Sequence, residues 1–285
     1  MSFIKHASPG AAGDFLHLEA LGLAWLREAE ATGGARVVDV RRQDGDRLEL
    51  ERIATITPTV QAAEVFGRAL ARTHAAGAGW FGQAPPGWEA TTGTIGQAPL
   101  VFTDALPNDA DGAMKIQSDW GIFYADKRIR PYLDMAIKRG WLAPETLHDF
   151  ERVRVRLVEG DFTSPQPGLV QRAGFSVARI HGDLWSGNVL WNPPVGDDSA
   201  RPWTGAVLID PAAQGGHAET DLAMLQLFGA PHVERILAAY DETSPLADGW
   251  RERVSLHQLH PLAVHAALFG PSYGREVAAL LRRYR

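Results

Sequence analysis

The sequence predicts an α+β fold, in which a small strand-containing N-terminal part precedes a larger, mainly helical part. Alternating apolar residues on both sides of the turn signal Asp44-Gly45-Asp46 indicate a β-hairpin. Beyond residue 60, long segments carry apolar residues at helical spacing. The 285 residues, of which 45% are hydrophobic and 22% charged, suffice for one large domain or two modest ones.

The N-terminal part is predicted to contain one helix between short strands. Phe3-Ile4-Lys5 ends the first strand, and Asp14 is the candidate N-cap of the helix. The apolar face of this helix carries Phe15, Leu18, Leu21 and Trp25. Gly33-Gly34 ends the helix, and alternation over 36–40 and 48–51 predicts two more strands.

The chain then crosses near residue 52 into the helical part. Helices are predicted over 60–75, 119–139 and 144–158, and from residue 217 to the C-terminus. The stretch 76–112 is rich in Gly, Pro, Ala and Thr and is predicted to be a long irregular connection. Two short apolar strands, at 189–191 and 206–209, enclose a polar loop.

Composition excludes several classes of protein. Lys and Arg number 28 against 34 Asp and Glu, so the net charge is −6, which does not favour nucleic-acid binding. Cysteine is absent, which excludes disulfides, thiolate zinc sites and cysteine nucleophiles. No secretory signal is visible, and no apolar run approaches the ~20 residues of a membrane-spanning helix. We therefore expect a cytoplasmic monomer that binds neither nucleic acid nor membranes.

The segment His181-Gly-Asp-Leu-Trp-Ser-Gly-Asn188 carries the strongest chemical signal. Asp183 stands five residues before Asn188, the spacing of a kinase catalytic loop, and a second acid, Asp210, ends a later strand. Phosphoryl transfer needs one carboxylate to accept the proton of the attacking hydroxyl, and an amide oxygen and a second carboxylate to hold Mg²⁺. The alternative interpretation is a polar turn between two strands.

Upstream, Lys5 on a strand and Glu19 on the next helix could form the ion pair that places an ammonium at nucleotide phosphates. Both could equally be solvated surface charges. His217 and Glu219 would fit a zinc hydrolase only weakly, since the deaminase version needs a cysteine pair.

At this point the chain resembles the fructosamine kinase (ketosamine kinase) family, which is related to aminoglycoside phosphotransferases. The resemblance implies a bilobal protein-kinase-like fold and covers nearly the whole chain. It rests on the segments Phe3-Ile-Lys5, 15–26, 181–188, 210–224, Phe228-Gly229, 256–261 and 268–270. Tryptophan directly after the Asp-Leu of the loop is rather specific to ketosamine kinases.

The resemblance implies a role for each site residue. Asp183 would be the catalytic base, and Asn188 and Asp210 would hold Mg²⁺. Lys5, held by Glu19, would contact the phosphates of ATP, and the hinge containing Glu51 and Ile53 would pair with adenine through its backbone. The residues expected to bind substrate are Trp185, His217, Glu219 and Trp120. Those expected to support the catalytic loop are His181 and Asp221.

One feature departs from the family pattern. Two or three strands and a glycine-containing loop normally precede the lysine, whereas here four residues precede Lys5. We therefore expect a nucleotide-binding lobe over 1–52 that lacks the glycine-rich loop, and a catalytic and substrate-binding lobe over 53–285. Three explanations fit: the reading frame begins late, an N-terminal segment is missing from this sequence, or the protein has lost the loop. Backbone donors above the phosphates help to position the transferred group, so nucleotide affinity and turnover are expected to be weaker if nothing replaces those strands.

Three functions remain open from the sequence. The first is an ATP-dependent kinase that phosphorylates a sugar hydroxyl of ketosamines, such as fructosyl or ribulosyl adducts of lysine or of proteins, and so takes part in deglycation. The second is a phosphotransferase for another hydroxyl compound, of the aminoglycoside or choline type. The third is a non-catalytic kinase-like binding protein, which the intact trio Asp183, Asn188 and Asp210 opposes.

Overall fold

The N-terminal sheet contains a β-hairpin around the predicted turn, but the first strand of this hairpin covers Val40–Asp44 and not the expected residues 36–40. The computed structural model describes residues 2–7, 15–104, 120–194 and 202–285, so the candidate cap Asp14 lies outside the described residues. The strands β1 (Ser2–His6), β4 (Arg47–Glu51) and β3 (Val40–Asp44) pair antiparallel in that order. Gly45 turns the hairpin in the left-handed region, with φ 54°. Leu48 and Leu50 point inward from β4, which gives this sheet one buried face.

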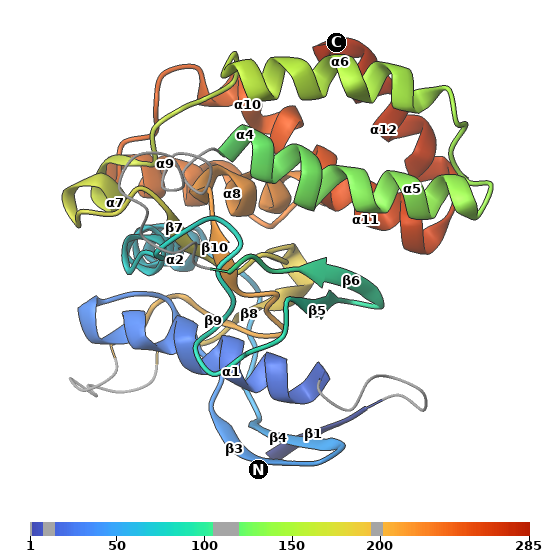
Figure 1. Cartoon of the computed structure of the whole chain (residues 1–285). Coiled ribbons are helices and arrows are strands. Elements are labelled where there is room, and N and C mark those ends of the chain that lie inside the picture. The colour runs from blue at the N-terminus through green and yellow to red at the C-terminus, as the bar shows by residue number, and fades with distance from the viewer. Residues whose placement is uncertain (1, 8–14, 105–119, 195–201) are drawn as a thin grey trace.

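Helix α1 (Phe15–Arg27) lies across this sheet, as predicted (Figure 1). The 3₁₀ turn η1 (Glu28–Thr32) follows it and ends at Gly33 in the left-handed conformation. The strand predicted over 36–40 is shorter: β2 (Arg36–Val37) pairs parallel with β9 (Ala206–Leu208), which pairs antiparallel with β8 (Val189–Trp191). Segments distant in sequence thus share one sheet.

Helix α2 (Val60–Ala75) has the bounds that its apolar pattern predicts. Its N-cap is Thr59, whose side chain accepts a hydrogen bond from the backbone N–H of Ala62 at 3.1 Å. The next segment differs from the prediction of irregular structure, because it contains the hairpin of β5 (Thr92–Ile95) and β6 (Ala98–Val101). Alternate side chains of this hairpin are buried, which explains why it forms despite its Gly, Pro and Thr content.

The larger part of the molecule is mainly helical (Figure 1). Its elements are α4 (Trp120–Phe123), the π-helical segment η2 (Tyr124–Ile129), α5 (Arg130–Lys138), α6 (Thr146–Glu159), α7 (Gly168–Arg172), β7 (Ala178–Ile180), η3 (Ser186–Asn188), β10 (Gln214–Gly216), α8 (Ala218–Leu227), α9 (Val233–Thr243), α10 (Trp250–His257), α11 (Leu259–Phe269) and α12 (Pro271–Tyr284). The short strands β7 and β10 pair antiparallel. The α+β class predicted from the sequence is confirmed.

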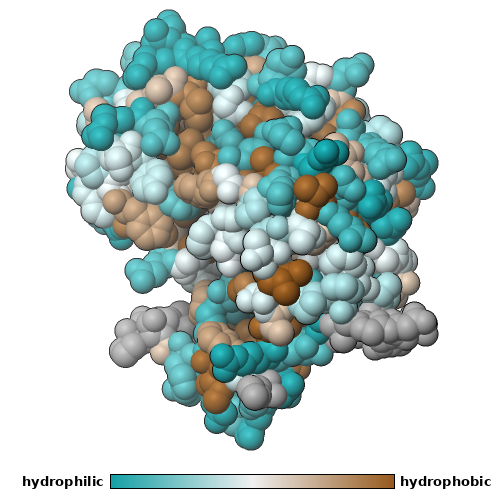
Figure 2. Space-filling view, turned by 180° about the vertical axis from the view of Figure 1, so that it is seen from behind, coloured by the Kyte–Doolittle hydropathy of each residue, from teal (hydrophilic) through white to brown (hydrophobic). Residues whose placement is uncertain are grey.

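One large hydrophobic core runs through most of these elements, and its bulkiest fully buried side chains include Tyr124, Tyr132, Tyr240, Phe66 and Phe150. Seen from behind, the surface is largely hydrophilic, with hydrophobic residues in small groups (Figure 2). Within the described residues, no helix combines the length and the apolar character needed to cross a bilayer.

Candidate active site

The loop between β7 and β8 folds back on itself around Asn188. The Asn188 side-chain amide donates to the backbone oxygen of Asp183 at 2.8 Å and to its carboxylate Oδ2 at 3.1 Å. It also lies 3.4 Å from the backbone oxygen of Asp210. The structure therefore brings together the three residues that the spacing singled out. Because the amide nitrogen is used in this way, the amide oxygen of Asn188 is left for a cation.

Asp221 holds the backbone of this loop from beneath. Its carboxylate accepts hydrogen bonds from the N–H of His181 at 2.7 Å and of Gly182 at 3.0 Å. His74 adds a contact of 3.2 Å from Nε2. Burial alone would raise the pKa of Asp221, but the hydrogen bond and charge of His74 outweigh it and lower the pKa. Asp221 is thus a buried carboxylate with several partners.

His181 and Gly182 are fixed by local geometry. The His181 Nε2 donates to the carbonyl of Ile209 at 2.9 Å, while its Nδ1 accepts from the N–H of Asp183 at 3.3 Å, which sets one neutral tautomer. Gly182 has φ 81°, and a Cβ there would overlap the carbonyl oxygen of Ala212. Glycine is therefore required at the position before Asp183.

Lys5 joins three elements at the edge of the site. Its Nζ lies 2.7 Å from Oε2 of Glu19 on α1 and 3.1 Å from Oδ1 of Asp210, just after β9. Asp210 has a left-handed backbone with φ 51°, which is rare for a residue with a side chain and aims its carboxylate toward Lys5. Its side chain is 42% exposed, so it can reach a ligand as well.

Burial and neighbouring charges together set the pKa values of Lys5 and Glu19. Burial lowers the pKa of Lys5, but the carboxylates of Glu19 and Asp210 outweigh that effect and raise the pKa, so the ammonium stays charged. Burial raises the pKa of Glu19 to about 7, with Asp210 adding to the rise and Lys5 opposing it. Consistent with a carboxyl that is costly to ionise, Oε1 of Glu19 has no hydrogen-bond partner among the described residues.

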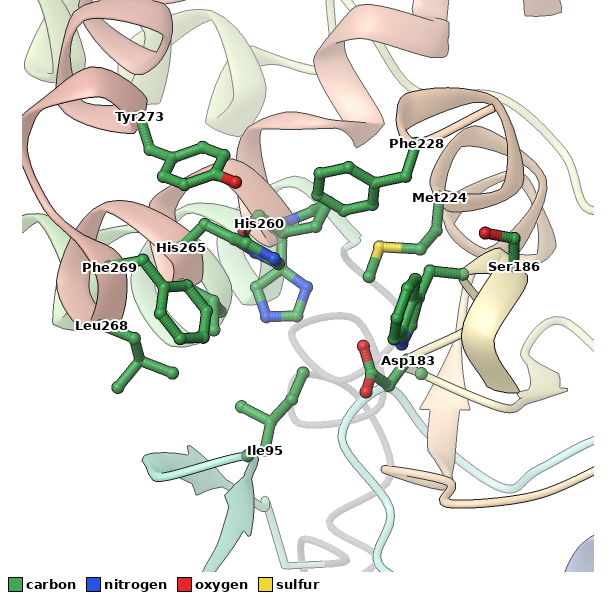
Figure 3. Close-up of a pocket in the computed structure, with 15 residues that line it drawn as sticks. Ile95, Asp183, Ser186, Met224, Phe228, His260, His265, Leu268, Phe269 and Tyr273 are labelled. Atoms are coloured by element: carbon green, nitrogen blue, oxygen red, sulfur yellow. Dashed lines mark hydrogen bonds between the residues drawn. The ribbon is translucent and has the colours of Figure 1, made fainter. Parts of the chain in front are cut away.

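A pocket of about 410 Å³ opens beside Asp183. It is lined by Ile95, Gly96, Gly182, Asp183, Trp185, Ser186, Met224, Phe228, His260, Pro261, Val264, His265, Leu268, Phe269 and Tyr273. Figure 3 shows Asp183 on one wall and the rings of His265, Phe269 and Tyr273 on the other. Among the described lining residues, Asp183 is the one carboxylate. Burial raises its pKa, and His181 and the Asn188 hydrogen bond partly offset the rise.

Of the four residues predicted to bind substrate, one lies in the pocket and three are buried elsewhere in the protein. Trp185 lines the pocket, is 41% exposed, and meets the ring of Phe228 edge-on at 6.5 Å. Trp120, His217 and Glu219 are buried and are not part of the lining. The Trp120 ring lies 5.8 Å from that of His217 and 4.7 Å from that of His257.

Arg253 forms an ion pair with Glu219 in the buried cluster of Trp120, His217, Glu219 and His257. Its guanidinium donates two hydrogen bonds to Glu219, at 2.6 and 2.9 Å. Burial by itself would raise the pKa of Glu219, but the contact with His257 and the hydrogen bonds from Arg253 outweigh burial and lower this pKa to about 2. Ligand atoms of His217, Glu219 and His257 lie within 4.8 Å of one another, but both Glu219 oxygens are already engaged by a cation. The cluster is thus better suited to bracing α8 and α10 than to metal binding.

The predicted hinge residues lie at the end of β4. The backbone N–H of Glu51 donates to the carbonyl of Asp39 at 2.8 Å, and its carboxylate pairs with Arg36. Ile53 is half-buried against the hydrophobic core. Both the side chain and the backbone N–H of Glu51 are therefore engaged within the protein.

The sequence prediction missed the wall that α11 contributes. His260, Val264, His265 and Leu268 follow one another at helical spacing and all face the pocket. That spacing was present in the sequence, but it does not distinguish a pocket wall from an ordinary buried helix face.

The arrangement of these elements is a protein-kinase-like fold. A macrolide 2′-phosphotransferase from Brachybacterium faecium superposes with a TM-score of 0.54 over 98% of this chain and 84% of its own, at 16% identity, which shows the shared fold. The bilobal kinase-like fold expected from the sequence is thereby confirmed.

The family follows from closer matches. The model of the fructosamine kinase family matches residues 2–285, so the chain belongs to that family. A Thermobifida fusca protein assigned as a fructosamine-3-kinase is 40% identical, with a TM-score of 0.78 over 99% of this chain and 85% of its own. A protein assigned as a ketoamine kinase in Enterococcus faecium is 32% identical over 59% of this chain and 54% of its own. The chain spans about half the length of the curated relatives it matches.

Proposed function

We propose that this protein transfers the γ-phosphoryl group of ATP to a sugar hydroxyl of a ketosamine. One observation carries the proposal: Asp183 belongs both to the wall of the pocket and, through Asn188, to the group formed by Asp210 and Lys5. An acceptor in the pocket and a nucleotide beside Lys5 would thus meet at Asp183. Membership of the fructosamine kinase family supports a ketosamine as the acceptor.

In this mechanism Asp183 orients the attacking hydroxyl and accepts its proton. The hydroxyl oxygen forms a bond to the γ-phosphorus, the bond from that phosphorus to the β,γ-bridging oxygen breaks, and ADP leaves with the electron pair. Burial raises the pKa of Asp183 and so makes the carboxylate a better base than a solvated one. The Asn188 hydrogen bond to Oδ2 keeps the carboxylate oriented.

The remaining charged groups would hold the nucleotide. Lys5 would contact the phosphates, kept in place by Glu19, and the backbone around Glu51 and Ile53 would receive the adenine. Asn188 and Asp210 offer the oxygen ligands that Mg²⁺ prefers, and the bound ion would neutralise charge on the transferred phosphoryl group. In this proposal residues 1–52 form the nucleotide lobe and 53–285 the catalytic and substrate lobe.

The pocket lining favours a ketosamine over a polycationic antibiotic. An aminoglycoside carries several ammonium groups, yet Asp183 is the one carboxylate among the described lining residues. Aromatic rings such as Trp185 and Phe269 can cover a single amine substituent and its apolar part. On protein-bound adducts, phosphorylation would begin deglycation.

The test is ADP release with magnesium and ATP, using fructosyl-lysine, ribulosyl-lysine, an aminoglycoside and choline as acceptors. We expect release with a ketosamine, and at least a thousandfold lower kcat for Asp183→Asn, because the amide cannot accept the proton. Asp44→Asn, at the exposed end of β3, is the matched control and should keep full activity. ADP release with none of the acceptors would reject the proposal in favour of a kinase-like binding protein.

A further inference from the structure

His260 is a buried polar residue in the pocket to which no role has been assigned above. It is the second residue of α11, and its side chain is 2% exposed. Figure 3 shows its imidazole directed into the middle of the pocket, between Ile95 and Asp183. The ring therefore forms part of the inner end of the pocket.

One nitrogen of the imidazole has no hydrogen-bond partner in the part of the chain that the structure describes. This nitrogen is Nε2, and it is buried. The backbone N–H of His260 donates to the hydroxyl of Tyr124 at 3.1 Å, and the ring of Tyr132 lies 5.5 Å from the imidazole, so the side chain is held by its surroundings. An unpaired buried polar atom is destabilising, and a ligand that supplies the missing hydrogen bond removes that cost.

The ring is neutral, which gives it both a donor and an acceptor. Burial lowers the pKa of His260 well below its usual value, and the nearby charges of Arg128 and His265 lower it further. A neutral imidazole of this kind matches a sugar hydroxyl, which also donates and accepts.

His265, the other histidine of α11 in the pocket, differs in its bonding. Its Nδ1 donates to the carbonyl of Pro261 at 2.8 Å, and its ring packs 4.9–5.1 Å from those of Phe228, Phe269 and Tyr273. His265 thus already has a hydrogen bond within the helix and aromatic contacts on several sides. Of the two, His260 is the histidine whose Nε2 has no hydrogen-bond partner among the described residues.

We infer that His260 hydrogen-bonds a sugar hydroxyl of the acceptor at the inner end of the pocket, and that it makes the site select polyhydroxylated acceptors. This inference rests on the proposed function and assigns a specificity-determining residue to it. A site built to bond a hydroxyl rejects an analogue without that hydroxyl, because its own buried polar group is then left unpaired. His260 would therefore discriminate between acceptors by their hydroxyl groups and would position the sugar beside Asp183.

The deciding variant is His260→Phe, which keeps a flat ring and removes the unpaired nitrogen. We expect its melting temperature to be unchanged or higher, since replacing an unsatisfied buried polar group by an apolar one of similar shape is neutral or stabilising. The KM for a ketosamine should rise at least tenfold, while the KM for ATP stays within twofold. His148→Phe, at an exposed position on α6, is the matched control.

A set of acceptors, each of which lacks a different hydroxyl group, identifies the hydroxyl that His260 binds. For one of these deoxy analogues, the KM of wild type should rise to that of His260→Phe. The KM of His260→Phe should be the same for that analogue and for the full sugar. If His260→Phe leaves the KM of every acceptor unchanged, or if it raises the KM of ATP and acceptor together, the inference is wrong.

Calorimetric titration of the ketosamine separates this inference from the proposed function, because it needs no turnover. Binding by wild type without ADP release, weakened at least tenfold in His260→Phe, would reject the kinase and keep the inference. Equal binding by wild type and His260→Phe, or no binding by wild type, would overturn the inference.

Discussion

At the scale of single residues, the pKa of Asp183 sets an observable limit on the reaction. Burial raises this pKa, so the carboxylate becomes protonated at a higher pH than a solvated aspartate, whose pKa is about 3.9. The protonated form cannot accept a proton, so the kcat/KM for the acceptor should fall on the acid side at a pH clearly above 4. We expect this in a pH profile at saturating ATP, with the melting temperature followed over the same range.

Glu19 needs a separate control in that experiment, because its pKa of about 7 lies within the range measured. Glu19→Gln removes this titration and can still accept a hydrogen bond from Lys5. The acid limb should persist in Glu19→Gln if Asp183 is the base. An acid limb at or below pH 4 in both proteins would contradict the assignment.

At the scale of elements, the N-terminus of α8 depends on a neutral histidine. The Nδ1 of His217 accepts a hydrogen bond from the N–H of Glu219 at 3.2 Å and so caps the helix. Burial lowers the pKa of His217 to about 4, and His257 and Arg253 add to this, against the charge of Glu219. Between pH 6.5 and 4 the unfolded chain therefore binds a proton that the native state does not, and stability falls as the pH falls.

His217→Asn tests this sign, since asparagine is a good N-cap that does not titrate. From pH 7 to pH 4, wild type should lose up to about 3 kcal/mol more free energy of unfolding than the variant, measured by denaturant titration. The comparison must be between the two proteins, because Glu19, whose pKa is raised on folding, acts in the opposite sense over the same range. Parallel pH profiles would show that His217 does not supply this dependence.

Sequence patterns predicted the elements whose signal is local. The turn at Gly45, the strand β4 and the helix α2 follow from a turn signal, alternation and apolar spacing within a few residues. The partner strand β3 begins at Val40, where the expected strand ended, because residues 36–37 pair with the distant strand β9 instead. The hairpin of β5 and β6 was not predicted, because Gly, Pro and Thr within 92–101 are typical of loops and its strands form only against buried neighbours.

The candidate site divides in the same way. The contacts of Asp183 with Asn188 span five residues and follow from the sequence. The pocket wall does not follow from the sequence. His260 lines the same pocket as Ile95 and Asp183 because α11 packs against parts of the chain that are distant in sequence. Trp120 and His217 illustrate the converse: the family resemblance implied substrate contact, whereas both residues are buried and neither is among the residues that line the pocket.

At the scale of the whole molecule, Lys5 connects the N-terminal sheet and α1 to the catalytic end of β9. Its ammonium neutralises Glu19, which is 3% exposed, and contacts Asp210. Lys5→Met should therefore have two separable effects. Leaving Glu19 buried and unpaired should cost about 1–3 kcal/mol of stability, less than the ~3–5 kcal/mol of a fully buried pair because Lys5 is partly exposed. Losing the charge beside Asp210 should raise the KM for ATP.

The double variant Lys5→Met/Glu19→Gln separates these two effects. It removes the unpaired carboxylate together with the ammonium, so we expect the melting temperature to return most of the way to that of wild type. The ammonium that would contact the phosphates is still missing, so the KM for ATP should remain raised and kcat low. Recovery of both stability and activity in the double variant would mean that Lys5 serves only to neutralise Glu19. Loss of activity without loss of stability in Lys5→Met would instead assign the residue to the nucleotide alone.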